Sequence, residues 1–195
     1  LFLRTVMLWI VEAILLAEAA KTGDVRLASM QIILNIFGFI SFGLDGFAHT
    51  AEAMVGDRQG KRAFWDMKVV IWRSTLLAFC IAVVISAALY FFQSPILTLI
   101  TNQHALIETT GALWLYVTIL PLVSFLAFQM DGVFVGATRS DEMRNGMVVA
   151  LGSFVLGLSM FPDTGLDAVL APFIFYLGTR GIFLLIRLPC LFTSR

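Results

Sequence analysis

Residues 74–107 read STLLAFCIAVVISAALYFFQSPILTLITNQHALI, with no lysine, arginine, aspartate or glutamate between Arg73 and Glu108. An α-helix needs about 20 apolar residues to cross the roughly 30 Å of hydrocarbon in a bilayer. The quoted stretch is longer than that and has no counterpart in a water-soluble domain. It therefore predicts a membrane protein.

The composition of the whole chain agrees with this prediction. Of its 195 residues, 59% are apolar and 13% are charged, whereas soluble domains have about 45–50% and about 25%. The 13 basic and 13 acidic residues cancel, so we expect no nucleic-acid partner and no polybasic lipid-binding tail. Cys80 and Cys190 lack the spacing of a metal site and are expected to be small core residues.

Hydropathy predicts six membrane spans and one domain over residues 1–195. Because backbone groups must be paired inside a bilayer, each span is expected to be an α-helix. The predicted fold class is thus an all-α membrane protein. The spans are placed at residues 2–20, 27–55, 69–92, 110–137, 147–161 and 169–188.

Lysine and arginine positions predict the orientation, because cytoplasmic loops are enriched in both. With both chain ends in the cytoplasm, the outer side carries only Lys21 and Arg26, and Arg180 lies within the last span. The cytoplasmic set is then Arg4, Arg58, Lys61, Arg62, Lys68, Arg73, Arg139, Arg144, Arg187 and Arg195. Since the chain opens on Leu1 and shows no signal peptide, we expect a fragment of a longer multi-pass protein.

Several predicted spans contain charged or titratable side chains. An acid near the bilayer centre costs about 2.5–3.5 kcal/mol on insertion scales, so each is expected to face protein or water. They are Glu12, Glu18, Asp45, His49, Glu52, Asp131 and Arg180.

The second span carries a regular polar stripe. Steps of four and three residues put its members on one helical face: Gln31, Asn35, Gly38, Phe42, Asp45, His49 and Glu52. Such a face predicts the lining of an aqueous path that binds a cation or carries protons. The alternative is that these groups hydrogen-bond to neighbouring helices and hold them together.

Roles within the stripe follow from depth and chemistry. Asp45 is the deepest acid and the preferred ion-coupling residue. Glu52 lies nearer the cytoplasmic end, where a solvated carboxylate is the alternative. His49 could relay a proton, because a histidine side chain ordinarily has a pKa of about 6.5. It could also serve as a simple hydrogen-bond partner.

Other spans contribute further candidates. Glu12 and Glu18 lie about 120° apart around the first helix, so they do not share a face, and Glu12 is the better cavity candidate. An ion pair between Asp131 and Arg180 would account for both without a cavity. His104 is expected in the outer loop before the fourth span. No HExxH, GxSxG or P-loop motif occurs, so no enzyme and no cofactor is predicted.

Two blocks of sequence resemble a known family. SFGLDGFAHTAEAMVG at Ser41–Gly56 and DGVFVGATRSDEMRNGM at Asp131–Met147 are similar to the DinF branch of the multidrug and toxic compound extrusion (MATE) transporters. The similarity extends upstream through the Gly23-Asp24 turn and Leu27–Gln31.

The resemblance implies the carboxy-terminal six-helix lobe of a twelve-helix bacterial inner-membrane antiporter. Such proteins export organic, often cationic, compounds by alternating access in exchange for protons or sodium. Asp45 and Glu52 match the acids of the signature helix, and Asp131 matches the acid of the later motif, so sodium at Asp131 or Asp45 is one possibility. Glu12 is about one turn from a position that is acidic in some relatives, and His49 stands where relatives often have an aromatic residue.

The missing amino-terminal lobe is therefore an expected partner, together with membrane lipid and small organic substrates. Two other functions remain open at this point. One is a flippase for lipid-linked oligosaccharides, whose cavity would be richer in arginine than one with Arg180 alone. The other is a membrane scaffold subunit in which the buried acids only join helices.

Overall fold

The structure, a computed structural model, describes residues 2–160 and 165–192, and helices make up nearly all of them. Phe161, Arg195 and the side chain of Arg4, which entered the predicted spans and orientation, lie outside the described residues. The helices are α1 (Phe2–Ala20), α2 (Asp24–Gly60), α3 (Phe64–Phe91), α4 (Gln93–Ile100), α5 (His104–Ala112), α6 (Trp114–Gly136), α7 (Ser140–Met160), α8 (Asp167–Arg187) and the short 3-10 helix η1 (Leu188–Leu191).

Five of the described helices are long and apolar enough to cross a membrane: α2, α3, α6, α7 and α8 with η1. They correspond to five of the six predicted spans. The first predicted span is helical over its full range as α1. It contains Glu12 and Glu18 among its 19 residues and is not one of the five.

The described helices differ from three expectations about where helices begin and end. The fourth span was placed at 110–137, but α5 ends at Ala112 and α6 begins at Trp114. His104, expected in a loop, begins α5. The fifth span was placed at 147–161, whereas α7 begins at Ser140. Hydropathy missed this polar first turn, in which Asp141 and Glu142 stabilise a helix start by facing the positive end of its dipole.

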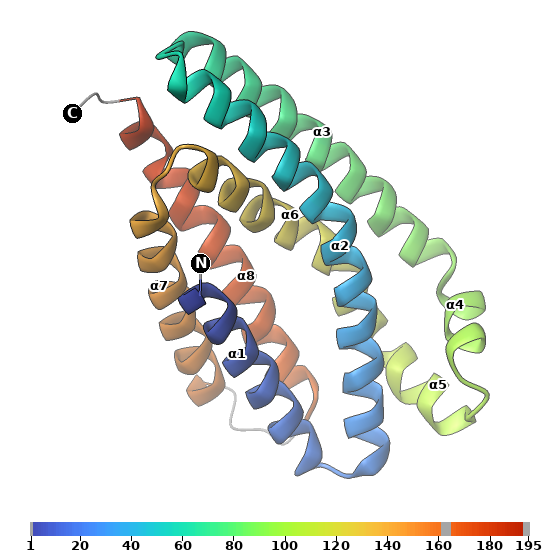
Figure 1. The fold of residues 1–195 in the computed structure, drawn as a ribbon. Coiled ribbons are helices and arrows are strands. Elements are labelled where there is room, and N and C mark those ends of the chain that lie inside the picture. The colour runs from blue at the N-terminus through green and yellow to red at the C-terminus, as the bar shows by residue number, and fades with distance from the viewer. Residues whose placement is uncertain (1, 161–164, 193–195) are drawn as a thin grey trace.

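The helices form two groups joined by α6 (Figure 1). α2 and α3 run side by side from the turn that joins them, and α1, α7 and α8 lie on the other side of the molecule. α6 contacts α2, α3 and α8, and its buried face includes even polar side chains such as Gln129 and Asp131. Any site on α2 is therefore supported from behind by α6.

One end of the molecule carries most of the basic side chains of the connections. The α2–α3 turn, the α6–α7 turn and the end of α8 lie together at the upper end in Figure 1, away from the α1–α2 turn. We call this the basic end, defined by Arg58, Lys61, Arg62, Arg139 and Arg187. All five belong to the set predicted to be cytoplasmic, and the side of the membrane that this end faces stays a prediction.

Both turns at the basic end use the same helix-ending motif. After α2, Arg62 has φ 55°. Its backbone N–H donates to the Gln59 carbonyl, and the backbone N–H of Ala63 donates to the Arg58 carbonyl. After α6, Thr138 has φ 57°. Its backbone N–H donates to the Val135 carbonyl, and the backbone N–H of Arg139 donates to the Phe134 carbonyl. These are Schellman motifs, which satisfy the last carbonyls of a helix. They join each pair of helices through a very short connection.

Candidate functional site

The polar stripe of α2 faces outward from the bundle. Gln31, Asn35 and His49 are exposed, and Asp45 and Glu52 are half-buried. Phe42, on the same stripe, is 79% exposed. The opposite face packs into the core through Ile33, Ile36, Phe37, Ile40, Leu44 and Ala48. The helical spacing thus placed the polar groups on the face that the other described helices leave open.

Side chains of the stripe bond along α2. The Gln31 amide donates to the Asn35 Oδ1 at 3.2 Å, and the Nδ1 of His49 lies 3.4 Å from the Oε2 of Glu52. Within residues 2–160 and 165–192 none of them bonds to another helix. The alternative in which these groups join neighbouring helices has no support from these contacts.

Asp45 stands between the two bonded pairs. It is half-buried and makes no hydrogen bond or ion pair with the described part of the chain. A carboxylate without a partner is free to exchange a proton or to contribute oxygen ligands to a cation. The role of Asp45 as the coupling acid stays a prediction.

Two glycines of α6 allow the backbones of α6 and α2 to touch, on the face of α2 opposite the stripe. A Cβ added to Gly132 would overlap the Ala48 carbonyl, and one added to Gly136 would overlap the Glu52 carbonyl. Glycines four residues apart permit this close approach between membrane helices. The segment of α2 that carries Asp45, His49 and Glu52 thus packs directly against the backbone of α6.

Asp131 lies away from the stripe and forms a buried ion pair. It is 3% exposed, and its Oδ2 contacts the Nη2 of Arg180 in α8, which is 0% exposed. The Arg180 guanidinium also lies 5.9 Å from the centre of the Phe128 ring. The Asp131–Arg180 pair that the sequence suggested is confirmed. A role for Asp131 in ion binding stays a prediction.

The two acids of α1 have different surroundings. Glu18 forms an ion pair with Lys21 at 2.6 Å near the end of the helix. Glu12 is exposed and has no ion pair with the described residues. The buried face of α1 instead contains Val11, Leu15 and Ala19. Glu18 is therefore locally neutralised, while the place of Glu12 in a cavity stays a prediction.

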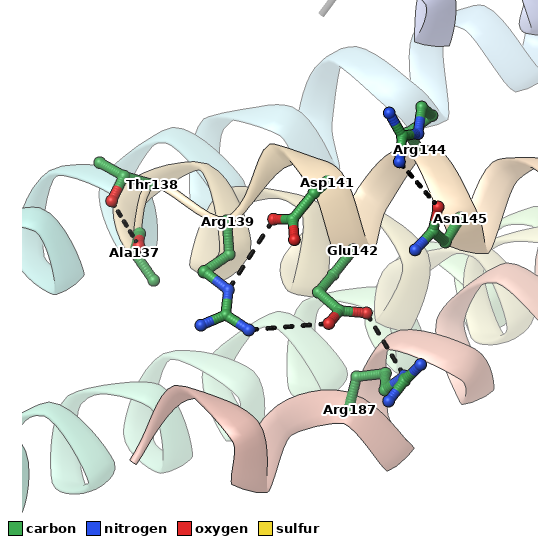
Figure 2. Close-up of polar contacts among 8 residues, drawn as sticks. All are labelled: Ala137, Thr138, Arg139, Asp141, Glu142, Arg144, Asn145 and Arg187. Atoms are coloured by element: carbon green, nitrogen blue, oxygen red, sulfur yellow. Dashed lines mark hydrogen bonds and ion pairs between the residues drawn. The ribbon is translucent and has the colours of Figure 1, made fainter. Parts of the chain in front are cut away.

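Figure 2 shows a charge network at the basic end that the sequence did not predict. Glu142, in the first turn of α7, is 8% exposed. Its carboxylate lies 3.7 Å from the Nη2 of Arg139 and 3.3 Å from the Nε of Arg187 at the end of α8, and Arg139 also faces Asp141 at 3.8 Å. Glu142 thus ties the α6–α7 turn to α8. In the sequence, the network was indicated only by the position of Glu142 in a block of charged residues at the start of a helix.

A second contact that the sequence did not predict joins α3 to α6. The Gln129 amide, 1% exposed, donates to the Ser74 hydroxyl at 2.8 Å. The described residues contain no group of three or more His, Cys, Asp or Glu side chains arranged to hold a metal ion. The candidate site is the open stripe of α2, in which Asp45 has no partner among residues 2–160 and 165–192.

Comparisons with known proteins agree with the sequence blocks. Residues 1–162 match the protein-family model described as MatE. The chain is 28% identical over 183 residues to DNA damage-inducible protein F of Escherichia coli K12, covering 93% of this chain and 40% of that protein. No solved structure matches.

Two plant proteins from Arabidopsis thaliana are also similar. Protein DETOXIFICATION 44, chloroplastic, is 22% identical over 91% of this chain and 34% of its own length. Protein DETOXIFICATION 27 is 25% identical over 75% of this chain and 30% of its own length. The chain thus spans 40% or less of the length of each of these relatives.

Proposed function

The chain belongs to the MatE family, and we propose that it is the carboxy-terminal lobe of an antiporter that exports organic, often cationic, compounds in exchange for protons or sodium. The observation that carries this proposal is the open polar face of α2. An apolar, membrane-length helix presents Asp45, His49 and Glu52 away from its own bundle.

The cost of exposed charge in a membrane supports an internal cavity. A carboxylate facing hydrocarbon costs about 2.5–3.5 kcal/mol, so the stripe needs water or a second protein surface over it. A second lobe facing α2 across a hydrated vestibule provides both. The relatives, more than twice as long as this chain, have room for such a lobe.

Each polar residue has a proposed task in this vestibule. Asp45 binds the coupling proton or sodium ion, and Glu52 with His49 passes ions toward the basic end. Gln31 and Asn35 contact the substrate from the other end of the stripe, and the exposed ring of Phe42 offers a cation–π surface to an organic cation. Glu12 borders the same cavity from α1, and Asp131 is a further candidate for the ion site.

We further propose that α1 completes a set of six membrane helices and that the basic end faces the cytoplasm of a bacterial cell. Lysine and arginine are enriched on the cytoplasmic side of membrane proteins, and the turns at the basic end carry more of them than the α1–α2 turn does. Alternation then moves this lobe against the other, opening the stripe to each side in turn.

Neither competing function has an observation in its favour at the stripe. A flippase for lipid-linked oligosaccharides would favour arginine in the cavity, but Arg180 is buried against Asp131. A scaffold would favour bonds from the stripe to other helices, and the stripe makes none to the other described helices. Both remain as outcomes of the experiment below.

The test is Asp45→Asn in the intact protein, compared with Asp57→Asn. Asp57 is on the same helix but outside the stripe, and it already pairs with Lys61 at 2.7 Å. Efflux of a cationic dye is measured in inside-out vesicles with an imposed proton or sodium gradient. We expect Asp45→Asn to abolish gradient-driven efflux with unchanged expression and melting temperature, and Asp57→Asn to retain it.

Three results would contradict the proposal. Unfolding or failed insertion of Asp45→Asn would favour the scaffold. Movement of a lipid-linked sugar in vesicles that show no drug-dependent proton or sodium flux would favour the flippase. Full gradient-driven efflux by Asp45→Asn would remove that residue from the coupling role.

A further inference from the structure

A groove between α2 and α3 near the basic end is separate from the polar stripe. It has a volume of about 540 Å³ and is lined only by residues of these two helices. Its walls are mostly apolar, with Phe47 and Met54 from α2 and Val70 and Leu77 from α3. A groove of this kind, on the surface of two membrane helices, accommodates a hydrocarbon chain.

Charged side chains are also present in the groove. Arg58 from α2, Arg73 from α3 and one acid, Asp66, line it. Arg73 is exposed and makes no hydrogen bond or ion pair with the described residues. Arg58 has only a loose contact with Asp57, at 3.8 Å. The groove therefore has a net positive charge and an arginine without an acidic partner among the described residues.

The position of Arg73 along α3 fixes its depth. It is the last charged residue before the uncharged stretch 74–107, so it marks where hydrocarbon begins. Two exposed tryptophans precede Arg73 in α3: Trp72 is 71% exposed and Trp65 is 76% exposed. Tryptophan is enriched at the membrane–water interface. The charged part of the groove thus lies at the level of lipid headgroups and its apolar part at the level of acyl chains.

We propose that this groove binds an anionic phospholipid of the surrounding membrane. The phosphate lies between the guanidinium groups of Arg58 and Arg73, which bind phosphate through paired N–H donors. One acyl chain lies along Phe47 and Leu77. The site requires only that the chain crosses a membrane, so it is independent of what the stripe of α2 transports.

The experiment measures lipid binding to the complete, delipidated protein in detergent by native mass spectrometry. Phosphatidylglycerol and phosphatidylcholine with the same acyl chains are titrated separately. An arginine at a membrane surface contributes enough to anionic lipid binding for about a fivefold change in affinity. We expect Arg73→Gln to weaken phosphatidylglycerol binding about fivefold and to leave phosphatidylcholine binding unchanged, while Arg73→Lys retains most of the preference.

Matched variants localise the effect. Arg144→Gln removes an exposed arginine of α7, outside the groove, and should have no effect. Val70→Trp fills the groove and should weaken binding of both lipids. Arg58→Gln replaces Arg73→Gln as the test if the latter does not fold. Size-exclusion chromatography and circular dichroism check the fold of each variant.

Several results would overturn the site. One is equal affinity of the wild type for the two lipids, and another is an effect of Arg144→Gln as large as that of Arg73→Gln. Leu77→Cys provides a third, because crosslinking of this cysteine to another segment of the complete protein in membranes would show that protein fills the groove. Competition between phosphatidylglycerol and a transported compound would assign the groove to the substrate.

Discussion

The buried ion pair between Asp131 and Arg180 gives the sharpest prediction for stability. We expect Asp131→Leu and Arg180→Met each to be strongly destabilising, and the double variant to be close to the wild type. The reason is that each single change leaves one charge in the interior without its main partner, whereas the double change removes both charges and keeps similar volumes.

The magnitude follows from the burial of both groups. Asp131 is 3% exposed and Arg180 is 0% exposed, so water cannot replace the lost partner. Breaking such a pair costs about 3–5 kcal/mol, while replacing both members by apolar residues is neutral or stabilising. At about 2–4 °C per kcal/mol for a domain of this size, each single variant should melt about 6–20 °C lower.

The two single variants should differ in a definite order. After Asp131→Leu, the Arg180 guanidinium still lies over the Phe128 ring, 5.9 Å from its centre. A cation–π contact contributes about 0.5–2 kcal/mol. No aromatic ring can do the same for the Asp131 carboxylate, which ring faces repel. Arg180→Met should therefore be the more destabilising change.

Differential scanning fluorimetry of the purified variants in one detergent measures these shifts, and efflux assays on the same variants test function. If the pair is purely structural, the double variant regains both stability and gradient-driven efflux. Recovery of stability without efflux would give Asp131 a part in ion coupling. Additive losses, with the double variant as unstable as the two single changes combined, would refute the reasoning.

Two other contacts give further predictions. Gly132→Ala places a methyl group against the Ala48 carbonyl and should lower the melting temperature, whereas Gly38→Ala, which meets no atom within 4 Å, should leave it unchanged or raise it. A melting temperature for Gly132→Ala equal to that of Gly38→Ala would contradict the backbone contact. Glu142→Gln should cost about 1 kcal/mol, because its arginine partners are partly exposed and screened by solvent. Asp141→Asn, whose contact is longer and more exposed, should cost less in the same melting assay.

Much of the helical organisation could be predicted from hydropathy. Asp57 and Arg58 end the apolar run of α2 close to its turn, and α1 has the predicted bounds. Hydropathy did not give the correct bounds where the end of a helix is polar or where a helix is interrupted. The first turn of α7 carries Asp141 and Glu142, and Leu113 separates α5 from α6 without any change in hydropathy.

The face of a helical residue could be predicted, but its partner could not. Steps of three and four fixed the common face of Asp45, His49 and Glu52, because they depend only on the geometry of one helix. The partner of Glu142 depends on how α7 and α8 pack, which no local pattern contains. The pairing of Asp131 with Arg180 could be suggested only because these were two opposite charges in two apolar spans.

The contacts of α6 favour movement of the bundle as a rigid unit. Gly132 places α6 in backbone contact with α2, and the adjacent Asp131 binds α8 through Arg180. Gly181, next to Arg180, also packs near the backbone of α6, where an added Cβ would lie 3.0 Å from the Ala127 nitrogen. Sliding α2 or α8 along α6 would break a buried ion pair or force backbone atoms into overlap. Alternating access at the stripe is therefore expected to come from rotation of this whole bundle against a second lobe, with α2, α6 and α8 keeping their contacts.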